Sequence, residues 1–193
     1  MFNRRKLVTL LWSRRSPLRG ADAAAIIEFA VSLPLLVVLV VGIFDFGGAF
    51  NLKQELNNAA REGARFAATQ PSNDLGLSVP PPSISAARFV VDSYLLTAGI
   101  NDCGLSTASF ALASGYTWVF SATGNGCSMT LTVNRRKPVQ EVIGGATVNI
   151  LCTTVNITYP YQWHFNNVIQ LLAPGANYSL GNIPVDATAV NMD

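Results

Sequence analysis

The sequence predicts an α+β protein, in which a long N-terminal transmembrane helix is followed by a second helix and an antiparallel β-sheet. A basic start runs into a continuous apolar stretch, and this stretch joins a polar helical segment without a break signal. The chain after about residue 100 is instead rich in Ser, Thr, Gly and Val, in short alternating runs. The predicted order is a basic leader at 1–22, a transmembrane helix at 23–50, its continuation at 51–70, a Pro-rich linker at 71–82 and an extracytoplasmic α+β domain at 83–193.

The apolar core of the first helix extends from Phe29 to Phe44 and is interrupted only by Ser32 and Pro34. With its apolar flanks it fills the segment 23–50, which is long enough for a membrane crossing because about 20 apolar residues suffice. The helix is expected to kink at the proline.

The positive charges indicate the orientation of this helix. Six basic residues precede the apolar segment, and the first one after it is Lys53. The positive-inside rule therefore places the N terminus in the cytoplasm and the rest of the chain on the exported side. A removable signal peptide is the alternative, since Gly47, Gly48 and Ala49 weakly imitate a cleavage site.

Composition fits one membrane-tethered domain. The chain has 193 residues, of which 50% are hydrophobic and 12% charged, and its mean hydropathy is +0.33. About 140 residues remain after the anchor, enough for one modest core. Beyond Phe50 there are seven basic and eight acidic residues, so the exported part has no electrostatic footprint for nucleic acid.

The segment 51–69 has no proline and continues the helix out of the membrane. Small and apolar residues recur in it at intervals of three and four, which predicts a narrow stripe for close packing. They are Leu52, Leu56, Ala59, Ala60, Gly63 and Phe66 or Ala67. The whole rod would be about 70 Å long.

Pro71 ends this helix, and three prolines at 80–82 stiffen the linker. A second helix is predicted from Ile84 to about Thr97, with Ser83 as its cap. Its apolar face would consist of Ile84, Ala87, Val91, Tyr94, Leu95 and Ala98.

Four strands are predicted in the remaining chain, at 116–121, 129–133, 147–159 and 178–189, with turns at 124–126 and 144–145. The third strand alternates in a way that suits a sheet with one covered face. We expect Arg135, Arg136 and Lys137 to form a solvated turn. The segment 162–172 is predicted as a short helix that packs toward the sheet through Trp163, Phe165, Val168, Leu171 and Leu172.

All three cysteines, Cys103, Cys127 and Cys152, fall on the exported side, where a periplasm-like compartment permits a disulfide. Spacing alone does not fix the pairing. We favour Cys103 with Cys127, across a Gly- and Ser-rich stretch, and the alternative is three small buried hydrophobes. No metal site is expected, because the cysteines are far apart and His164 is isolated.

Three short motifs carry a family resemblance: Glu28-Phe29-Ala30 before Pro34-Leu35-Leu36, then Gly42-Ile43, then the run from Ala59 to Arg65. Over roughly residues 20–68 the chain resembles the TadE-like family of pilin-related proteins. The resemblance implies a type IV pilin-like architecture. It also implies a role as a minor pseudopilin or assembly factor of the tight-adherence (Flp) pilus of bacteria, a system of secretion and cell adhesion.

The resemblance also implies partners and processing. The partners are the inner membrane, other pilins or pseudopilins, the tight-adherence machinery and a prepilin peptidase. In the prepilin-like pattern a Gly precedes the cut and Glu is the fifth mature residue. Here Gly20 lies eight residues before Glu28, and counting back from the Glu places the bond between Ala23 and Ala24. The chain is thus cut after Ala23, cut poorly, or left whole.

Assembly residues follow from the same resemblance. A carboxylate in hydrocarbon requires a partner, and for Glu28, next to Phe29, that partner would be the free amino group of a neighbouring subunit. Its alternative place is the headgroup boundary. Arg61, Glu62 and Arg65 are either a solvated helix face or, with Gly63 at their centre, a face that docks the rod onto its own domain or a sister subunit.

Catalysis is not predicted, and neither is a cofactor. With one histidine there is no Ser-His-Asp set, and no phosphate loop or HExxH motif is present. A pair of Cys152 and His164 is conceivable, but a histidine between two aromatic residues is more often packed than catalytic. The competing function is a membrane-anchored binding domain with an inert tether.

Overall fold

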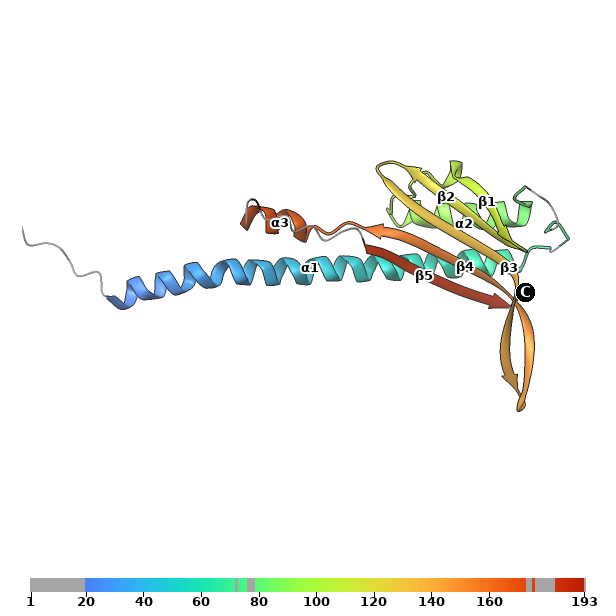
Figure 1. Ribbon diagram of the computed structural model, residues 1–193, viewed down its shortest axis with the longest axis horizontal. Coiled ribbons are helices and arrows are strands. Elements are labelled where there is room, and N and C mark those ends of the chain that lie inside the picture. Colours follow the sequence, from blue (N-terminus) through green and yellow to red (C-terminus); the bar gives the residue numbers. More distant parts are fainter. Residues whose placement is uncertain (1–19, 72, 76–78, 173–174, 176–182, 193) are drawn as a thin grey trace, which may run out of the picture.

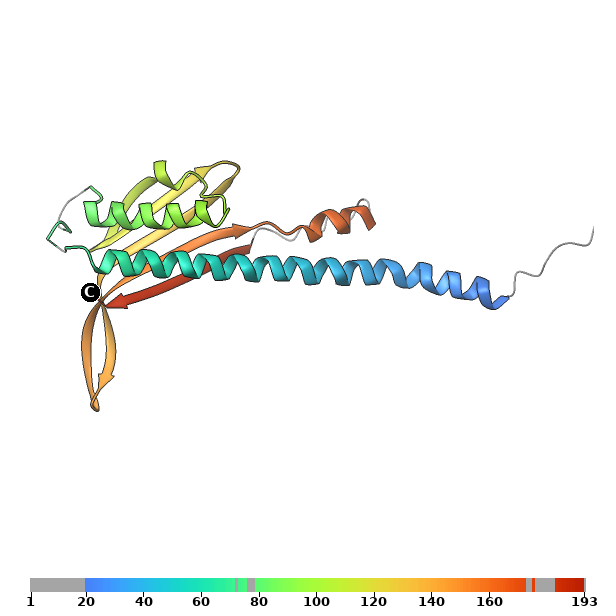
Figure 2. The same ribbon diagram turned by 180° about the vertical axis from the view of Figure 1, so that it is seen from behind.

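The computed structural model describes residues 20–71, 73–75, 79–172, 175 and 183–192. Its first element, α1 (Gly20–Ala68), is a 49-residue helix that passes Pro34 without interruption. The C-terminal half of α1 lies against the domain, whereas its N-terminal half extends away from it (Figure 1, Figure 2). The predicted long helix and α+β fold are confirmed; residues 1–19 of the predicted leader lie outside the described residues.

The domain contains α2 (Pro82–Thr97), a 3-10 turn η1 (Leu105–Thr107), α3 (Phe165–Leu172) and a five-stranded antiparallel sheet in the order β1-β2-β3-β4-β5. The strands are β1 (Ser109–Ser114), β2 (Thr117–Gly124), β3 (Cys127–Ile143), β4 (Ala146–Tyr161) and β5 (Ile183–Met192). The turns expected at 124–126 and 144–145 join β2 to β3 and β3 to β4. The part of the last predicted strand at 178–182 lies outside the described residues.

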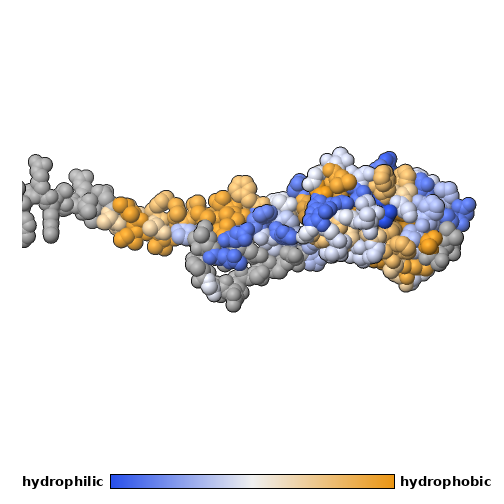
Figure 3. Space-filling model, turned by 90° about the horizontal axis from the view of Figure 1, so that it is seen from above, coloured by the Kyte–Doolittle hydropathy of each residue, from blue (hydrophilic) through white to orange (hydrophobic). Residues whose placement is uncertain are grey.

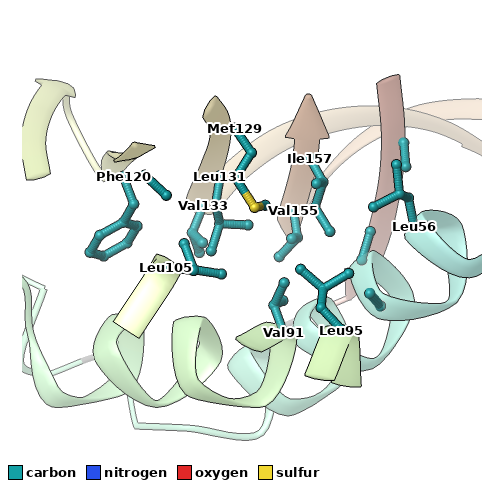
Figure 4. Packing of buried hydrophobic residues seen from close by; sticks show 14 of the residues in the cluster. Leu56, Val91, Leu95, Leu105, Phe120, Met129, Leu131, Val133, Val155 and Ile157 are labelled. Carbon is teal, nitrogen blue, oxygen red and sulfur yellow. The ribbon is translucent and has the colours of Figure 1, made fainter. Parts of the chain in front are cut away.

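One face of the sheet carries the core. Alternate residues of β3 and β4 point to the same side, where α1 and α2 cover them (Figure 4). Leu131 pairs with Ile157, and Val133 pairs with Val155. From the helices, Leu56, Val91 and Leu95 fill this layer. The covered face predicted from the strand alternation is therefore present.

The start of α2 differs from the prediction. Ser83 is not the N-cap, because the helix already begins at Pro82 and has no side-chain cap at Pro81. Asp74 of the linker serves instead: its carboxylate accepts hydrogen bonds from the Ser83 backbone N–H and hydroxyl, each at 3.0 Å. A carboxylate at a helix N terminus satisfies free N–H groups and complements the helix dipole.

The predicted turn at Arg135, Arg136 and Lys137 is wrong. These residues lie within β3, at an irregularity in its pairing with β4, and Arg136 has a φ of 59°. Arg135 is buried, and its guanidinium donates to the carbonyls of Gln70 and Pro71 just after α1. The basic residue thus fixes the end of the long helix.

Beyond this irregularity the β3–β4 hairpin projects from the body of the domain (Figure 1). Most of its residues are exposed on both faces, including Val142 and Ile143 near the tip. The unpredicted strand β1 is also exposed along its whole length, which explains why it has no inward-facing apolar alternation.

Candidate functional site

The N-terminal half of α1 presents an apolar surface. Ile26, Phe29 and Phe44 are 68%, 65% and 76% exposed, and apolar residues dominate this narrow part of the molecule (Figure 3). The helix is long and apolar enough to cross a membrane. An exposed apolar surface of this kind is unfavourable in water, so α1 serves as a single-pass membrane anchor.

The residues predicted for processing and assembly lie early in this anchor. α1 begins at Gly20, and Ala23 and Ala24 are exposed residues of its first turns. Glu28 and Phe29 are exposed as well. Their surroundings in a membrane would be lipid or another subunit, so cleavage after Ala23 and pairing of Glu28 stay predictions.

Gly63 lies where α1 crosses the domain. A Cβ on this residue would stand 2.6 Å from Val91 Cγ2 and 3.7 Å from Val155 Cγ1, so only glycine permits the observed approach of α1 to α2 and β4. Buried alanines on the same side continue this close contact: Ala59, Ala60, Ala64 and Ala67. Of the two partners expected for Gly63, its own domain lies against it.

The charged neighbours of Gly63 do not share its packing. Arg61 and Arg65 are exposed, and Arg65 forms an ion pair with Glu62 at 2.6 Å on the helix surface. Such an exposed pair contributes little to stability, typically about 0 to 1 kcal/mol. The structure therefore divides the predicted face into an inward Gly63 and an outward charged ridge.

Asp45 is the most unusual residue of α1, because it is buried at the end of an otherwise exposed apolar stretch. Its carboxylate accepts hydrogen bonds from the Tyr161 hydroxyl at 2.9 Å, the His164 N–H at 3.2 Å and the Phe165 N–H at 2.8 Å. The Nδ1 atom of His164 also lies 3.2 Å from Asp45 Oδ1. We call this set of contacts the Asp45 clasp; it binds the end of β4 and the start of α3 to the anchor.

Tyr161 lies very close to α1, and its hydroxyl keeps its proton at physiological pH. Its hydroxyl also donates to the Asp45 carbonyl at 2.9 Å, and a Cβ on Gly48 would stand only 2.8 Å from the Tyr161 hydroxyl oxygen. Burial, followed by the hydrogen bond to Asp45 and its charge, raises the pKa of Tyr161 to about 12. The phenol therefore remains a donor over the physiological pH range.

Aromatic rings surround the clasp. The Trp163 ring lies edge-on to Phe46 of α1 at 5.3 Å and to Tyr161 at 5.1 Å. Such edge-to-face pairs are worth about 0.5–1.5 kcal/mol each beyond the area they bury. The contacts add Phe46, the residue after Asp45 in α1, to the attachment between α1 and the segment that follows β4.

Asp45 was not predicted as a functional residue. The residues on either side of it are apolar and form part of the predicted span, and the prediction rests on them alone. The available signal was the charge itself, since an acidic residue inside an apolar helix normally has a buried partner. His164 was expected to be packed, but its side chain is 81% exposed.

The short helix at 162–172 was expected to pack toward the sheet, and this is wrong. α3 lies beyond the sheet and alongside α1 (Figure 1). Phe165 and Val168 of this helix are half-buried, and Asn167 and Gln170 are exposed. The Asp45 clasp explains this position because it fixes the first residues of α3 on α1.

The cysteines do not form a reactive site with the histidine. Cys103 and Cys127 form a disulfide with Cα atoms 5.2 Å apart, and Cys152 is buried. Cys152 pairs with Lys137 and Met192, nine residues along β4 from Tyr161, which is about 30 Å in a strand. Cys152 and His164 are therefore not brought together. Within the described residues no cluster of His, Cys, Asp and Glu has the arrangement of a metal site.

A family model described as TadE-like protein matches residues 23–65. The match confirms the resemblance over α1 and associates the chain with membrane proteins of the Tad pilus. It covers the exposed apolar half, Asp45 and Gly48 of the clasp, and Gly63. No curated protein and no solved structure matches the chain.

Proposed function

We propose that the chain is a minor pseudopilin or assembly factor of the tight-adherence (Flp) pilus. It would reside in the bacterial inner membrane, with its N terminus in the cytoplasm and its domain in the periplasm, and it would act by protein–protein assembly rather than catalysis. The observation that carries this proposal is the division of α1 into an exposed apolar half and a packed half. The family match spans both halves.

A rod of this kind suits side-by-side packing of subunits. The exposed half is a single helix with no other described element around most of its circumference. A neighbouring apolar helix would cover residues that otherwise contact only lipid, and helix pairs in membranes associate through such van der Waals packing. The packed half transmits this arrangement to the domain because Gly63 and the Asp45 clasp hold the two together.

Glu28 is the proposed register element of the assembly. In an apolar surrounding its carboxylate requires a cationic partner. A subunit cut between Ala23 and Ala24 by a prepilin peptidase would supply one, because cleavage creates a free amino group four residues before the carboxylate. The exposed ridge of Arg61, Glu62 and Arg65 is then free for contacts with other components of the pilus machinery.

The experiment is complementation of a strain that lacks the gene. Residues 24–44 are replaced by an unrelated apolar transmembrane segment, and Glu28→Gln is tested separately. Lys53→Gln is the matched control, because it removes an exposed charge from α1 outside the apolar half. We expect the first two variants to lower surface pili at least tenfold at an unchanged protein level, and the control to retain them.

The same experiment distinguishes the pseudopilin role from the competing function. A membrane-anchored binding domain with an inert tether should tolerate the segment replacement. If pili persist with the unrelated segment and with Glu28→Gln, the pseudopilin role is wrong and the tether is only an anchor.

A further inference from the structure

The Asp45 clasp determines where α3 lies along the membrane anchor α1. The Phe165 N–H bonds to Asp45, so α3 starts at the level of that residue. From there the chain continues toward the N-terminal end of α1 (Figure 1). Its eight residues span about 12 Å, which carries it back along α1 by about seven or eight residues, to the level of Val37 and Val38.

The accessibility of α1 agrees with this position. Val38, Val41 and Gly42 are half-buried, although the apolar residues around them are exposed. With Asp45 and Ala49 they form one stripe at intervals of three and four, and the packing of α3 against α1 lies on this side. α3 therefore shares the depth of residues 38–45 in the anchor.

Residues 38–45 of α1 lie at the outer end of the predicted membrane span. A span of about 20 residues that starts at Ala23 ends near Gly42. The exposed residues Leu39, Ile43 and Phe44 occupy the same turns as the half-buried stripe. If α1 crosses the membrane with these residues in lipid, α3 is carried to the outer boundary of the hydrocarbon layer.

The composition of the segment fits that environment. No Asp, Glu, Lys or Arg occurs between Glu141 and Asp186, whereas the preceding part of the domain carries both signs of charge. A helix also satisfies its own backbone groups, as a membrane requires. Of the first N–H groups, which a helix leaves free, that of Phe165 is bound by Asp45. Trp163 and Tyr161 occupy the boundary, where aromatic residues are enriched in membrane proteins.

We propose that α3 is a second membrane contact: a short amphipathic helix that lies beside α1 at the outer boundary of the bilayer, where the half-buried Phe165 and Val168 contact acyl chains and the exposed amides Asn167 and Gln170 face the headgroups. This inference rests on the membrane anchor and not on the pilus role. Asp45 then has a defined task, since it fixes the depth of α3 and is itself shielded from the hydrocarbon by the groups that it binds.

The test is depth-dependent fluorescence quenching in vesicles. The full chain, in a Cys152→Ala background that keeps the disulfide, is reconstituted into phosphatidylcholine–phosphatidylglycerol vesicles. Val168→Cys carries an environment-sensitive fluorophore, and nitroxide-labelled lipids are the quencher. Leu39→Cys, at an exposed site of the anchor, is the positive control, and Val142→Cys, an exposed valine of the projecting hairpin, is the matched negative control.

We expect the Val168 label to be quenched at least fivefold more than the Val142 label and to resist aqueous iodide. Quenching equal to that at Val142, with access to iodide, would place α3 in water and overturn the inference. Protection from both quenchers would show a protein cover and would overturn it too. Phe165→Cys, on the same side of α3, repeats the measurement if Val168→Cys does not form the Cys103–Cys127 disulfide. Loss of pili in Glu28→Gln has no bearing on these outcomes.

Discussion

At the scale of residues, a single side chain, that of Asp45, links the membrane anchor to the domain. A carboxylate at the edge of hydrocarbon is costly when unpaired, and here the end of β4 and the start of α3 supply its donors. Loss of these contacts would leave both a desolvated charge and free N–H groups. The membrane thus favours the docked state more strongly than water would.

Gly48→Ala should open the Asp45 clasp. The added Cβ would stand 2.8 Å from the Tyr161 hydroxyl, whereas at Gly47 nothing lies within 4 Å. Overlap of this kind costs about 1–3 kcal/mol, and both substitutions gain the same helix propensity. Amide hydrogen exchange of the full chain in micelles should therefore accelerate about tenfold over residues 162–172 in Gly48→Ala and stay unchanged in Gly47→Ala. Equal exchange in the two variants would contradict the close approach.

Asp92 should make the domain less stable as the pH rises. Burial, then the hydrogen bond and charge of Asp102, raise the pKa of Asp92 above its ordinary value of 3.8. A raised pKa in the folded state stabilises the fold fully below the unfolded pKa, and this contribution is lost as the pH rises through the folded pKa.

Asp92→Asn imitates the protonated acid and is expected to raise the melting temperature at pH 7 more than at pH 4. Thermal denaturation of the full chain in micelles, followed by circular dichroism, measures the melting temperature at each of the two pH values. Glu141→Gln, at an exposed site in the projecting hairpin, controls for the loss of one negative charge. An equal effect of Asp92→Asn at the two pH values would refute the raised pKa.

At the scale of elements, the contact of α1 with α2 and β4 depends on Gly63. In Gly63→Leu the side chain would overlap Val91, whose methyl group is already 2.6 Å from the position of a Cβ. Overpacking should cost about 3 kcal/mol, or about 10 °C in melting temperature for a domain of this size, and pili should be lost. Gly47→Leu introduces the same side chain into open space on α1 and is expected to leave both unchanged. Wild-type pilus output and protein level in Gly63→Leu would show that the close packing is dispensable.

The elements that could be predicted from sequence are those whose signal is local. α1 and α2 have long periodic patterns; Pro71 follows the first, three prolines at 80–82 mark the start of the second, and Gly124 to Gly126 mark a turn. The position of Arg135 could not be predicted, because an irregularity inside a long strand looks like a polar turn until its partner β4 is known. α3 was predicted as a helix, but its place depends on Asp45, 120 residues earlier in the chain.

At the scale of the whole molecule, two attachments on α1 define how the protein is held. Gly63 and its alanines seat one end of the domain, and the Asp45 clasp fixes the other near the membrane. The interval between these residues is 18 positions, about 27 Å of helix. The domain is consequently aligned along the rod rather than hinged at its end, and any tilt of the anchor is transmitted to the sheet and to the projecting β3–β4 hairpin.

The inferred orientation of the molecule, with its domain on the exported side of the membrane, predicts the state of its three cysteines. The Cys103–Cys127 disulfide closes a loop with a sequence separation of 24, and such a loop restricts the unfolded chain by about 3.5 kcal/mol in the chain-entropy model. It forms only where thiols are oxidised, as in a periplasm. Alkylation of the denatured protein from native membranes, followed by mass measurement, should find one modified cysteine before reduction and three after it. The variant Cys152→Ala should give none and two. Three modified cysteines before reduction would place the domain in a reducing compartment, and the inferred direction of α1 across the membrane would then be reversed.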